Sequence, residues 1–270
     1  MQSTGLNRKT IDKFYTTPNV VNDCIEKITT YVNIKNDDLC IEPSAGNGSF
    51  IDGIKTLSDN YKFYDLKPEN EEIIEQDYLE LNITPLNNGK IHVIGNPPFG
   101  RQSSYAIKFI KKSCKFCDTI SFILPKSFRK DSMKKHFPLN FHLLYEYELP
   151  ENSFIIDEKE YHVPCVFQIW IKKNKNRKVP ELLTPNNYSF VKKDEDNDIS
   201  FRRVGVYAGK IDKVTETKSS QSHYFIKFDV ELTDELFKKL SEVNFNSKND
   251  TCGPKSISKQ ELIKEYNMII

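Results

Sequence analysis

Ile91-His-Val-Ile-Gly-Asn-Pro-Pro-Phe-Gly100 is an apolar, strand-like run that stops at two consecutive prolines. Because proline has no backbone N–H, the strand cannot continue, and the chain must leave the sheet in a stiff, sharp turn. The turn presents two acceptors, the Asn96 side-chain oxygen and the Pro97 carbonyl, beside Pro98 and the Phe99 ring. Two fixed acceptors suit a planar amino group, and the ring offers a nucleobase a stacking face worth about 1–3 kcal/mol. We expect residues 96–99 to be catalytic through positioning; the alternative is a structural turn with a core phenylalanine.

A glycine-rich segment, Ile41-Glu-Pro-Ser-Ala-Gly-Asn-Gly-Ser-Phe50, lies upstream, between a strand-like run and a helical one. Gly46 and Gly48 allow the backbone to pass close to a ligand, as in nucleotide-binding turns. The third glycine of the dinucleotide fingerprint is missing, because Ile51 occupies its place. The segment therefore disfavours a pyrophosphate cofactor and remains compatible with a ligand that carries one nucleoside.

Short apolar runs alternate with helix-patterned segments over the first two-thirds of the chain. This alternation predicts an α/β fold with a mainly parallel sheet flanked by helices. The expected strands are residues 39–42, 61–64, 91–94, 119–124, 142–147 and 164–171, and the expected helices are residues 19–31, 49–58 and 105–116.

Two aspartates follow the glycine-rich segment at successive strand ends. Asp65 ends the second expected strand, where a carboxylate can accept hydrogen bonds from both hydroxyls of a ribose. Asp77 lies ahead of the next core strand, in a loop that can aim it at an adenine amino group. Either one alone is more typical of a helix cap or a turn. Ligands of open parallel sheets bind outside the carboxyl ends of the strands, so the order of the two residues favours ligand contacts.

The pattern changes beyond Lys178, which predicts two domains, residues 1–178 and 179–270. The second is expected to be a small β-rich, partly helical appendage that recognises the substrate. Its expected strands are residues 188–191, 199–206 and 223–228, and its expected helices are residues 233–243 and 259–266. The stretch 202–209 contains two arginines and two glycines. It fits a contact with a nucleic-acid backbone or a solvated edge strand equally well.

Composition indicates an ordinary globular protein with 38% hydrophobic and 29% charged residues and a formal net charge of +1. Any basic surface must therefore be local. Cys114 and Cys117 form a CxxC without a second pair, which favours half-buried thiols over a metal site. The chain begins without a signal-type apolar segment, and no apolar run is long enough to span a bilayer. We expect no membrane partner and a reducing, cytoplasmic location, whether in a cell or in the host of a virus.

Three motifs together resemble the amino-methyltransferase group of class I S-adenosylmethionine-dependent enzymes. Asn96-Pro-Pro-Phe99 resembles the catalytic (N/D/S)PP(Y/F/W) motif, and Glu42-Pro-Ser-Ala-Gly-Asn-Gly48 resembles the glycine-rich cofactor loop. Asp12-Lys-Phe-Tyr-Thr-Thr-Pro18 resembles the short N-terminal motif of DNA adenine methyltransferases, and the order of motifs is similar to the γ group. The resemblance implies a Rossmann-like class I methyltransferase fold with S-adenosyl-L-methionine as cofactor and DNA as partner. It implies in-line methyl transfer to N6 of a flipped adenine.

The resemblance also assigns roles to single residues. At the cofactor, Tyr15, Thr16 and Thr17 would lie near the methionyl carboxylate, Glu42, Ser44 and Gly46 beside the methionine and ribose, Asp65 at the ribose and Asp77 at the adenine amine. At the substrate, Asn96, Pro97, Pro98 and Phe99 would hold the target base, Phe154 or alternatively Tyr161 would pack against it, and Lys126 and Arg129 would bind phosphate.

Other substrates and one other class of protein fit the same motifs. An amino group of RNA, on adenine or guanine, and N4 of cytosine fit the same pair of acceptors. A nucleic-acid-binding subunit with an inactive methyltransferase fold is the non-enzymatic alternative. Such a subunit is expected to lose cofactor or catalytic residues, whereas Asp65, Asn96–Phe99 and the glycine loop are all present.

Overall fold

The computed structural model describes residues 14–84, 89–156 and 158–270, so Asp12 and Lys13 of the N-terminal motif lie outside the described residues. The chain divides into two compact units, Met1–Val179 and Pro180–Ile270, each of which is described by itself.

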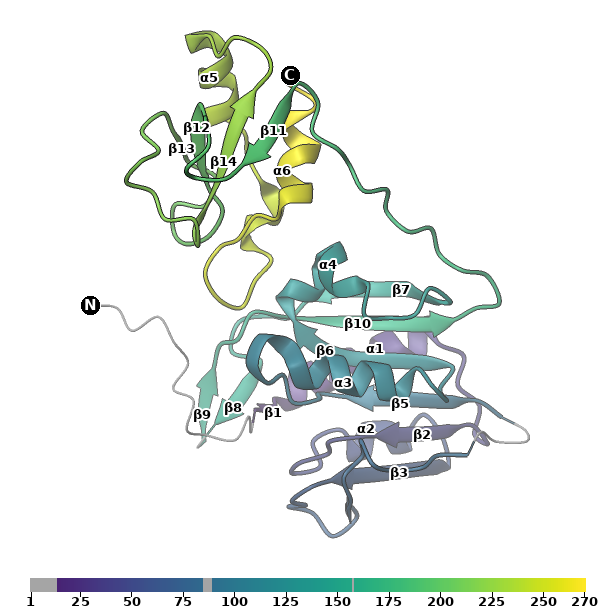
Figure 1. The fold of residues 1–270 in the computed structure, drawn as a ribbon. Coiled ribbons are helices and arrows are strands. Elements are labelled where there is room, and N and C mark those ends of the chain that lie inside the picture. The colour runs from purple at the N-terminus through teal and green to yellow at the C-terminus, as the bar shows by residue number, and fades with distance from the viewer. Residues whose placement is uncertain (1–13, 85–88, 157) are drawn as a thin grey trace. The chain divides into compact units, whose positions relative to one another are not determined.

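Unit 1 is built on a seven-stranded sheet with the order β4-β3-β2-β5-β6-β10-β7 (Figure 1). The strands from β4 to β6 are parallel to their neighbours, whereas β10 runs antiparallel to both β6 and β7. The bounds are β2 Leu39–Glu42, β3 Asn60–Asp65, β4 Ile74–Glu75, β5 Ile91–Gly95, β6 Thr119–Pro125, β7 Phe141–Glu148 and β10 Cys165–Lys172. The mainly parallel α/β sheet expected from the sequence is confirmed.

The three central strands β2, β5 and β6 are buried along their whole length. Strands covered on both faces read as continuous apolar runs, which is why the sequence revealed them. From β2 the chain builds outward through β3 to β4, and then returns to place β5 on the other side of β2. The carboxyl ends of β2 and β5 are therefore adjacent at the point where the strand order reverses, the usual ligand position in such sheets.

Helices cover both faces of this sheet (Figure 1). Helices α1 and α2 contact each other on one face, and α3 lies on the other. In α1 the buried positions Val20, Val21, Cys24 and Ile28 recur at helical spacing. The bounds are α1 Pro18–Tyr31, α2 Ile51–Lys55, α3 Ser104–Ser113 and α4 Asp131–Lys134, with 3-10 turns η1 Arg101–Ser103 and η2 Lys126–Arg129. Helix α2 is shorter than the expected 49–58, because turns occupy both ends of that segment.

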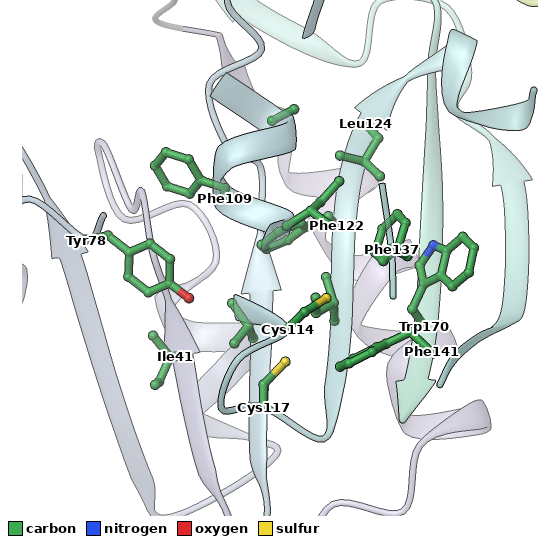
Figure 2. Packing of buried hydrophobic residues seen from close by; sticks show 14 of the residues in the cluster. Ile41, Tyr78, Phe109, Cys114, Cys117, Phe122, Leu124, Phe137, Phe141 and Trp170 are labelled. Atoms are coloured by element: carbon green, nitrogen blue, oxygen red, sulfur yellow. The ribbon is translucent and has the colours of Figure 1, made fainter. Parts of the chain in front are cut away.

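The core on the α3 face contains large aromatic side chains (Figure 2). Phe137 and Trp170 stack with ring centroids 3.9 Å apart. Cys114 and Cys117 are buried free thiols in this core, and burial raises the pKa of Cys114 to about 12. Within the described residues, no group of three or more His, Cys, Asp or Glu side chains is arranged to hold a metal ion.

In a small sheet with the order β1-β8-β9, the N-terminal motif pairs with the segment that follows β7. Its strands are β1 Tyr15–Thr16, β8 Phe154–Ile156 and β9 Lys159–Tyr161, all paired antiparallel. None of these strands was expected from the sequence. With two or three residues each, they show no periodicity from which a strand can be recognised.

Unit 2 is an antiparallel sheet with the order β11-β14-β12-β13, packed with two helices around a core of its own. The bounds are β11 Tyr188–Val191, β12 Ile199–Arg202, β13 Ile211–Asp212, β14 His223–Phe228, α5 Asp234–Ser241, η3 Asn246–Asn249 and α6 Lys259–Tyr266. Strand β12 stops at Arg202, short of the expected residue 206, because Val204 bridges to Ser256 instead and Gly205 turns with a φ of +102°. Among the described residues, no helix combines the length and apolar character needed to cross a bilayer.

Candidate active site

The loops that follow β2 and β5 meet at the carboxyl edge of the sheet. The Ser44 hydroxyl of the first loop donates a hydrogen bond to the backbone oxygen of Asn96 in the second, at 3.2 Å. Gly46 and Gly48 have φ values of +55° and +88°, a conformation that costs glycine little and other residues more. The glycine-rich segment and the Pro-Pro turn predicted from the sequence therefore form one site.

The Asn96 side chain is held in one orientation by the N-terminal segment. Its amide nitrogen donates to the Phe14 carbonyl at 3.0 Å and to the Thr16 hydroxyl at 3.3 Å. Both N–H groups are thereby used, which leaves Oδ1 buried without a hydrogen-bond partner. A buried acceptor without a donor costs about 1–3 kcal/mol. The residue lines a small pocket with Phe14, Pro97, Pro98 and Phe99, so a donor that enters this pocket can relieve that cost.

The N-terminal segment also lies against the glycine loop. A Cβ atom at Gly46 would lie 3.3 Å from Cε1 of Tyr15, so the tyrosine ring leaves no free space for a side chain there. The Tyr15 hydroxyl donates to the Glu69 carboxylate at 2.7 Å. Thr16 pairs with Phe154 of β8, and the Thr17 N–H donates to the Ser153 carbonyl at 3.0 Å. Tyr15 thus contacts the glycine loop and Thr16 contacts Asn96.

Asp65, at the end of β3, accepts a hydrogen bond from the glycine loop. One carboxylate oxygen accepts from the Gly46 N–H and the other from the Lys67 N–H, both at 2.8 Å. A carboxylate oxygen has two acceptor positions, so each keeps one for a ligand hydroxyl. The same side chain can therefore hold the loop and bind a diol.

Glu42 ends β2 as a buried carboxyl without a neutralising partner. It is 2% exposed, and its Oε2 accepts no hydrogen bond. Burial, and then the nearby charge of Asp65, raise the pKa of Glu42 to about 8. Gly95 is required beside it, because a Cβ there would lie 3.1 Å from Cγ of Glu42 and φ at this glycine is +143°.

S-adenosyl-L-methionine offers donors, namely an amino group, two ribose hydroxyls and an adenine amine. The site offers acceptors, since the Asp65 oxygens each keep a free position, and it also contains the Glu42 Oε2 atom, which has no hydrogen-bond partner. The residues present therefore fit this cofactor. When bound, it supplies an electrophilic methyl group on a sulfonium.

The remaining predicted contact residues have partners of their own within the chain. Asp77 Oδ1 accepts from the Leu79 N–H at 2.8 Å, a turn-forming bond, and its contact with adenine stays a prediction. Lys126 and Arg129 are already paired with the Glu148 carboxylate of β7. A phosphate would have to compete with that ion pair for both cations.

The aromatic residues beside the pocket differ in exposure. Phe154 is completely buried and lies edge-on to Phe14, with ring centroids 6.1 Å apart. Tyr161 is 39% exposed, with its ring centroid 5.8 Å from that of Phe14. Of the two sequence candidates for packing on a target base, the exposed Tyr161 has the more accessible ring. Phe14 was not singled out from the sequence, although it stands in the N-terminal motif directly before Tyr15.

Comparison with known proteins agrees with these features. The model of a family described as the EDM2 methyltransferase-like domain matches residues 53–194, which is more than half of the chain. Ribosomal RNA small subunit methyltransferase A of Francisella tularensis subsp. novicida (strain U112) is 29% identical over 201 residues, which cover 66% of this chain and 75% of the relative.

Two solved structures are more distant likenesses. The type I restriction-modification system methyltransferase subunit from Streptococcus thermophilus is 17% identical with a TM-score of 0.46, over 62% of this chain and 46% of that subunit. The 23S rRNA methyltransferase ErmE is 12% identical with a TM-score of 0.46, over 61% of this chain and 71% of that chain. On the family match, the chain belongs to the EDM2 methyltransferase-like domain family and is an S-adenosyl-L-methionine-dependent methyltransferase of class I fold.

Proposed function

We propose that this chain methylates N6 of adenine in DNA, by direct in-line transfer to a base that has left the helical stack. The observation that carries the proposal is the buried Asn96 Oδ1, an acceptor without a donor in a pocket shared with Pro97, Pro98 and Phe99. An exocyclic amine carries two N–H groups, and the Asn96 and Pro97 oxygens are two acceptors for them.

The proposed role of residues 96–99 is to hold the amine. Asn96 Oδ1 and the Pro97 carbonyl accept hydrogen bonds from its two N–H groups, which directs the nitrogen lone pair away from the ring and towards the methyl donor. The Phe99 ring stacks on the base. Neither asparagine nor proline is a strong base, which fits a reaction driven by positioning and charge stabilisation. Flipping a base costs a few kcal/mol, which stacking and the amine hydrogen bonds offset.

The proposed cofactor contacts follow the loops around β2 and β3. Asp65 accepts from the ribose hydroxyls and Asp77 from the adenine amine. Ser44 and Gly46 shape the loop beside the ribose, with Glu42 beneath it, and Tyr15, Thr16 and Thr17 border the methionine end. Lys126 and Arg129 are proposed to contact phosphate. Tyr161 is proposed, in preference to Phe154, to pack on the target base.

The choice of DNA rests on the N-terminal segment. Phe14-Tyr-Thr-Thr-Pro18 resembles a motif of DNA adenine methyltransferases and adjoins both the glycine loop and Asn96. RNA adenine is the second candidate, because the relative at 29% identity is a ribosomal RNA methyltransferase. Both candidates need the same amine-holding turn.

A labelling experiment distinguishes them. The protein is incubated with methyl-labelled cofactor and, separately, with DNA, RNA and protein pools, and modified nucleosides are identified by mass spectrometry. We expect labelled N6-methyldeoxyadenosine from the DNA pool. Label in N6-methyladenosine from RNA alone would select the second candidate, and label only in protein or on a ring carbon would contradict the proposal.

A further inference from the structure

Unit 2 contains a cavity that the methyl-transfer site does not use. It has a volume of about 340 Å³, within the range of small-ligand sites. Its walls come from the end of β11, the start of β14 and the first residue of α6, elements that lie together in Figure 1. Phe190 and Tyr224 supply aromatic rings, and Lys192, Lys193 and Lys259 supply ammonium groups.

The charges around this cavity are unbalanced. Three lysines and one acidic residue, Asp194, are among the residues that line it. The charged residues of unit 2 number 14 Lys or Arg against 15 Asp or Glu, so the positive excess is confined to the residues that line the cavity, next to the Glu195 carboxylate that accepts from the Lys192 N–H. Burial is the main cause of a lowered pKa of His223, which also lines the cavity, so this side chain adds no charge at neutral pH. The lysines therefore make the cavity attractive to an anion.

Lys259 is held over the rings without a described carboxylate partner. Its ammonium lies 4.5 Å from the Phe190 centroid and 5.7 Å from the Tyr224 centroid. The Arg203 guanidinium lies 5.5 Å from the Tyr224 centroid. An exposed cation–π contact is worth about 0.5–1 kcal/mol, whereas a hydrogen bond to a charged group is worth about 1.5–3 kcal/mol. A phosphate can therefore draw the ammonium from the ring and leave the ring face to a base.

From this arrangement we infer that the cavity binds a single-stranded segment of nucleic acid, with its phosphates on Lys192, Lys193 and Lys259 and a base against Phe190 and Tyr224. Bases in a duplex are stacked on each other, so a ring face from which Lys259 has moved selects unpaired ones. The inference rests on the proposed function in taking a nucleic acid as the ligand. It assigns to unit 2 a strand-binding role separate from residues 96–99.

The charge contribution is tested in the full-length chain by replacing Lys192, Lys193 and Lys259 together with Gln. The matched control replaces Lys238, Lys239 and Lys264, which lie on α5 and α6 and do not line the cavity. Fluorescence anisotropy with a labelled single-stranded oligonucleotide is measured over a salt series. Each phosphate contact on a single strand contributes about 0.7 to the slope of log K against log salt. The cavity variant is expected to lose about 2 from the slope and at least about tenfold in affinity, and the control less than about threefold.

The aromatic contribution needs a separate pair of variants. Phe190→Leu is compared with Tyr207→Leu, because Tyr207 is exposed and also has a lysine, Lys210, 4.7 Å from its ring centroid, yet does not line the cavity. Phe190→Leu is expected to weaken single-strand binding about fivefold or more, and Tyr207→Leu to leave it unchanged. Circular dichroism verifies that each variant folds.

The outcomes separate this inference from the proposed function. Equal losses in the cavity and control lysine variants, or binding unaffected by both Phe190→Leu and the lysine variant, would overturn the inference even if the wild type methylates a base. Cavity-dependent binding without any methylated base would leave the inference in place and remove the proposed reaction. Inorganic phosphate and a mononucleotide serve as competitors. Full competition by phosphate alone would reduce the site to an anion site and contradict base binding.

Discussion

At the scale of single residues, the site depends on how its polar atoms are satisfied. Asn96 donates both side-chain N–H groups to the N-terminal segment, and its oxygen is left without a donor. If the Asn96 side-chain amide were rotated so that Nδ2 and Oδ1 changed places, it would present N–H groups to the pocket, and these cannot accept a hydrogen bond from an amine. The contacts with Phe14 and Thr16 therefore determine which atom of the Asn96 amide is left without a partner.

Replacing Thr16 by Val tests this orienting contact. The variant keeps the shape and loses the hydroxyl, so the Asn96 amide is held by one bond. We expect the rate of methyl transfer to fall about tenfold, the effect of one hydrogen bond, with a smaller change in cofactor affinity. Thr16→Ser should restore the rate. Thr29→Val, on the exposed side of α1, is the control. A loss confined to cofactor affinity would show that Thr16 serves the cofactor alone.

Glu42 makes the stability of the protein depend on pH. Its pKa rises from an ordinary value of 4.5 to about 8 in the folded chain, mainly through burial. The folded state thus holds this proton more tightly than the unfolded state. The contribution of Glu42 to stability therefore falls as the pH rises from 4.5 to about 8.

Glu42→Gln removes the titrating group at nearly the same volume. We expect the melting temperature of the variant, without added cofactor, to exceed that of the wild type by an amount that grows from pH 5 to pH 8 and then levels off. Thermal unfolding followed by circular dichroism at each pH gives the difference. A constant difference across this range would mean that Glu42 is ionised in the folded chain.

At the scale of elements, the sequence predicted the buried strands and the longer helices well. Strands β11 and β14 and helix α6 have the expected bounds, and the central strands differ by one residue or none at each end. These elements carry their own apolar pattern. Strands β1, β8 and β9 do not, because they exist only through pairing between residues far apart in the chain. The contact of Phe14 with Asn96 spans 82 residues and could not be predicted for the same reason.

The same distinction holds for the candidate site. The two loops were predictable because each follows a recognisable strand, and the strand order brings them together. The ion pairs of Lys126 and Arg129 could not be predicted from the sequence. Their partners Glu146 and Glu148 lie on β7, and the pairing of β7 with β10 sets their position. The burial of Phe154 likewise follows from the small sheet with β1.

Asp38 holds the amino-terminal ends of β2 and β5 together by hydrogen bonds, at the edge of the sheet opposite their carboxyl ends. Its carboxylate accepts from the Lys35 N–H at 2.9 Å and the Lys90 N–H at 2.7 Å, and lies 3.2 Å from Nε2 of His92. Burial raises the pKa of Asp38, but these bonds outweigh it and the pKa is lowered overall. Stability from this group is therefore present above its unfolded pKa of about 3.9 and is lost as the pH falls through the lower, folded value.

Asp38→Asn is expected to reduce the free energy of unfolding by about 1.5–3 kcal/mol at pH 7, because bonds to a charged acceptor become bonds to a neutral one. The difference in free energy of unfolding between the variant and the wild type should become smaller below about pH 4. Urea unfolding at pH 7 and pH 3.5 measures both values. An equal gap at the two pH values would show that the charge of Asp38 contributes nothing.

At the scale of the whole molecule, each unit buries apolar residues of its own. Arg177 is bonded to the Leu139 carbonyl of unit 1, and Leu183 is bonded to Gln260 of unit 2. The residues between them, 178–182, make no hydrogen bond within the described part of the chain. Exposed backbone without hydrogen bonds is where proteases cut.

Limited trypsin digestion is therefore expected to cut first after Lys178, and each fragment should keep its own fold. Mass spectrometry locates the cut, and circular dichroism with size exclusion shows whether the fragments stay folded. Lys173, bonded through its N–H to the Asn140 carbonyl, offers a nearby comparison site that should resist. A first cut inside either core would contradict the division into two independent units.

The most direct test of the account concerns Asn96, and it measures methyl transfer and cofactor affinity in one protein. For Asn96→Ala we expect no detectable transfer to adenine, because the amine loses an acceptor that the fold holds for it, while calorimetry finds cofactor affinity within about threefold of the wild type. Turnover at the wild-type rate, or a defect explained by lost cofactor affinity alone, would contradict the claim that this oxygen holds the amine.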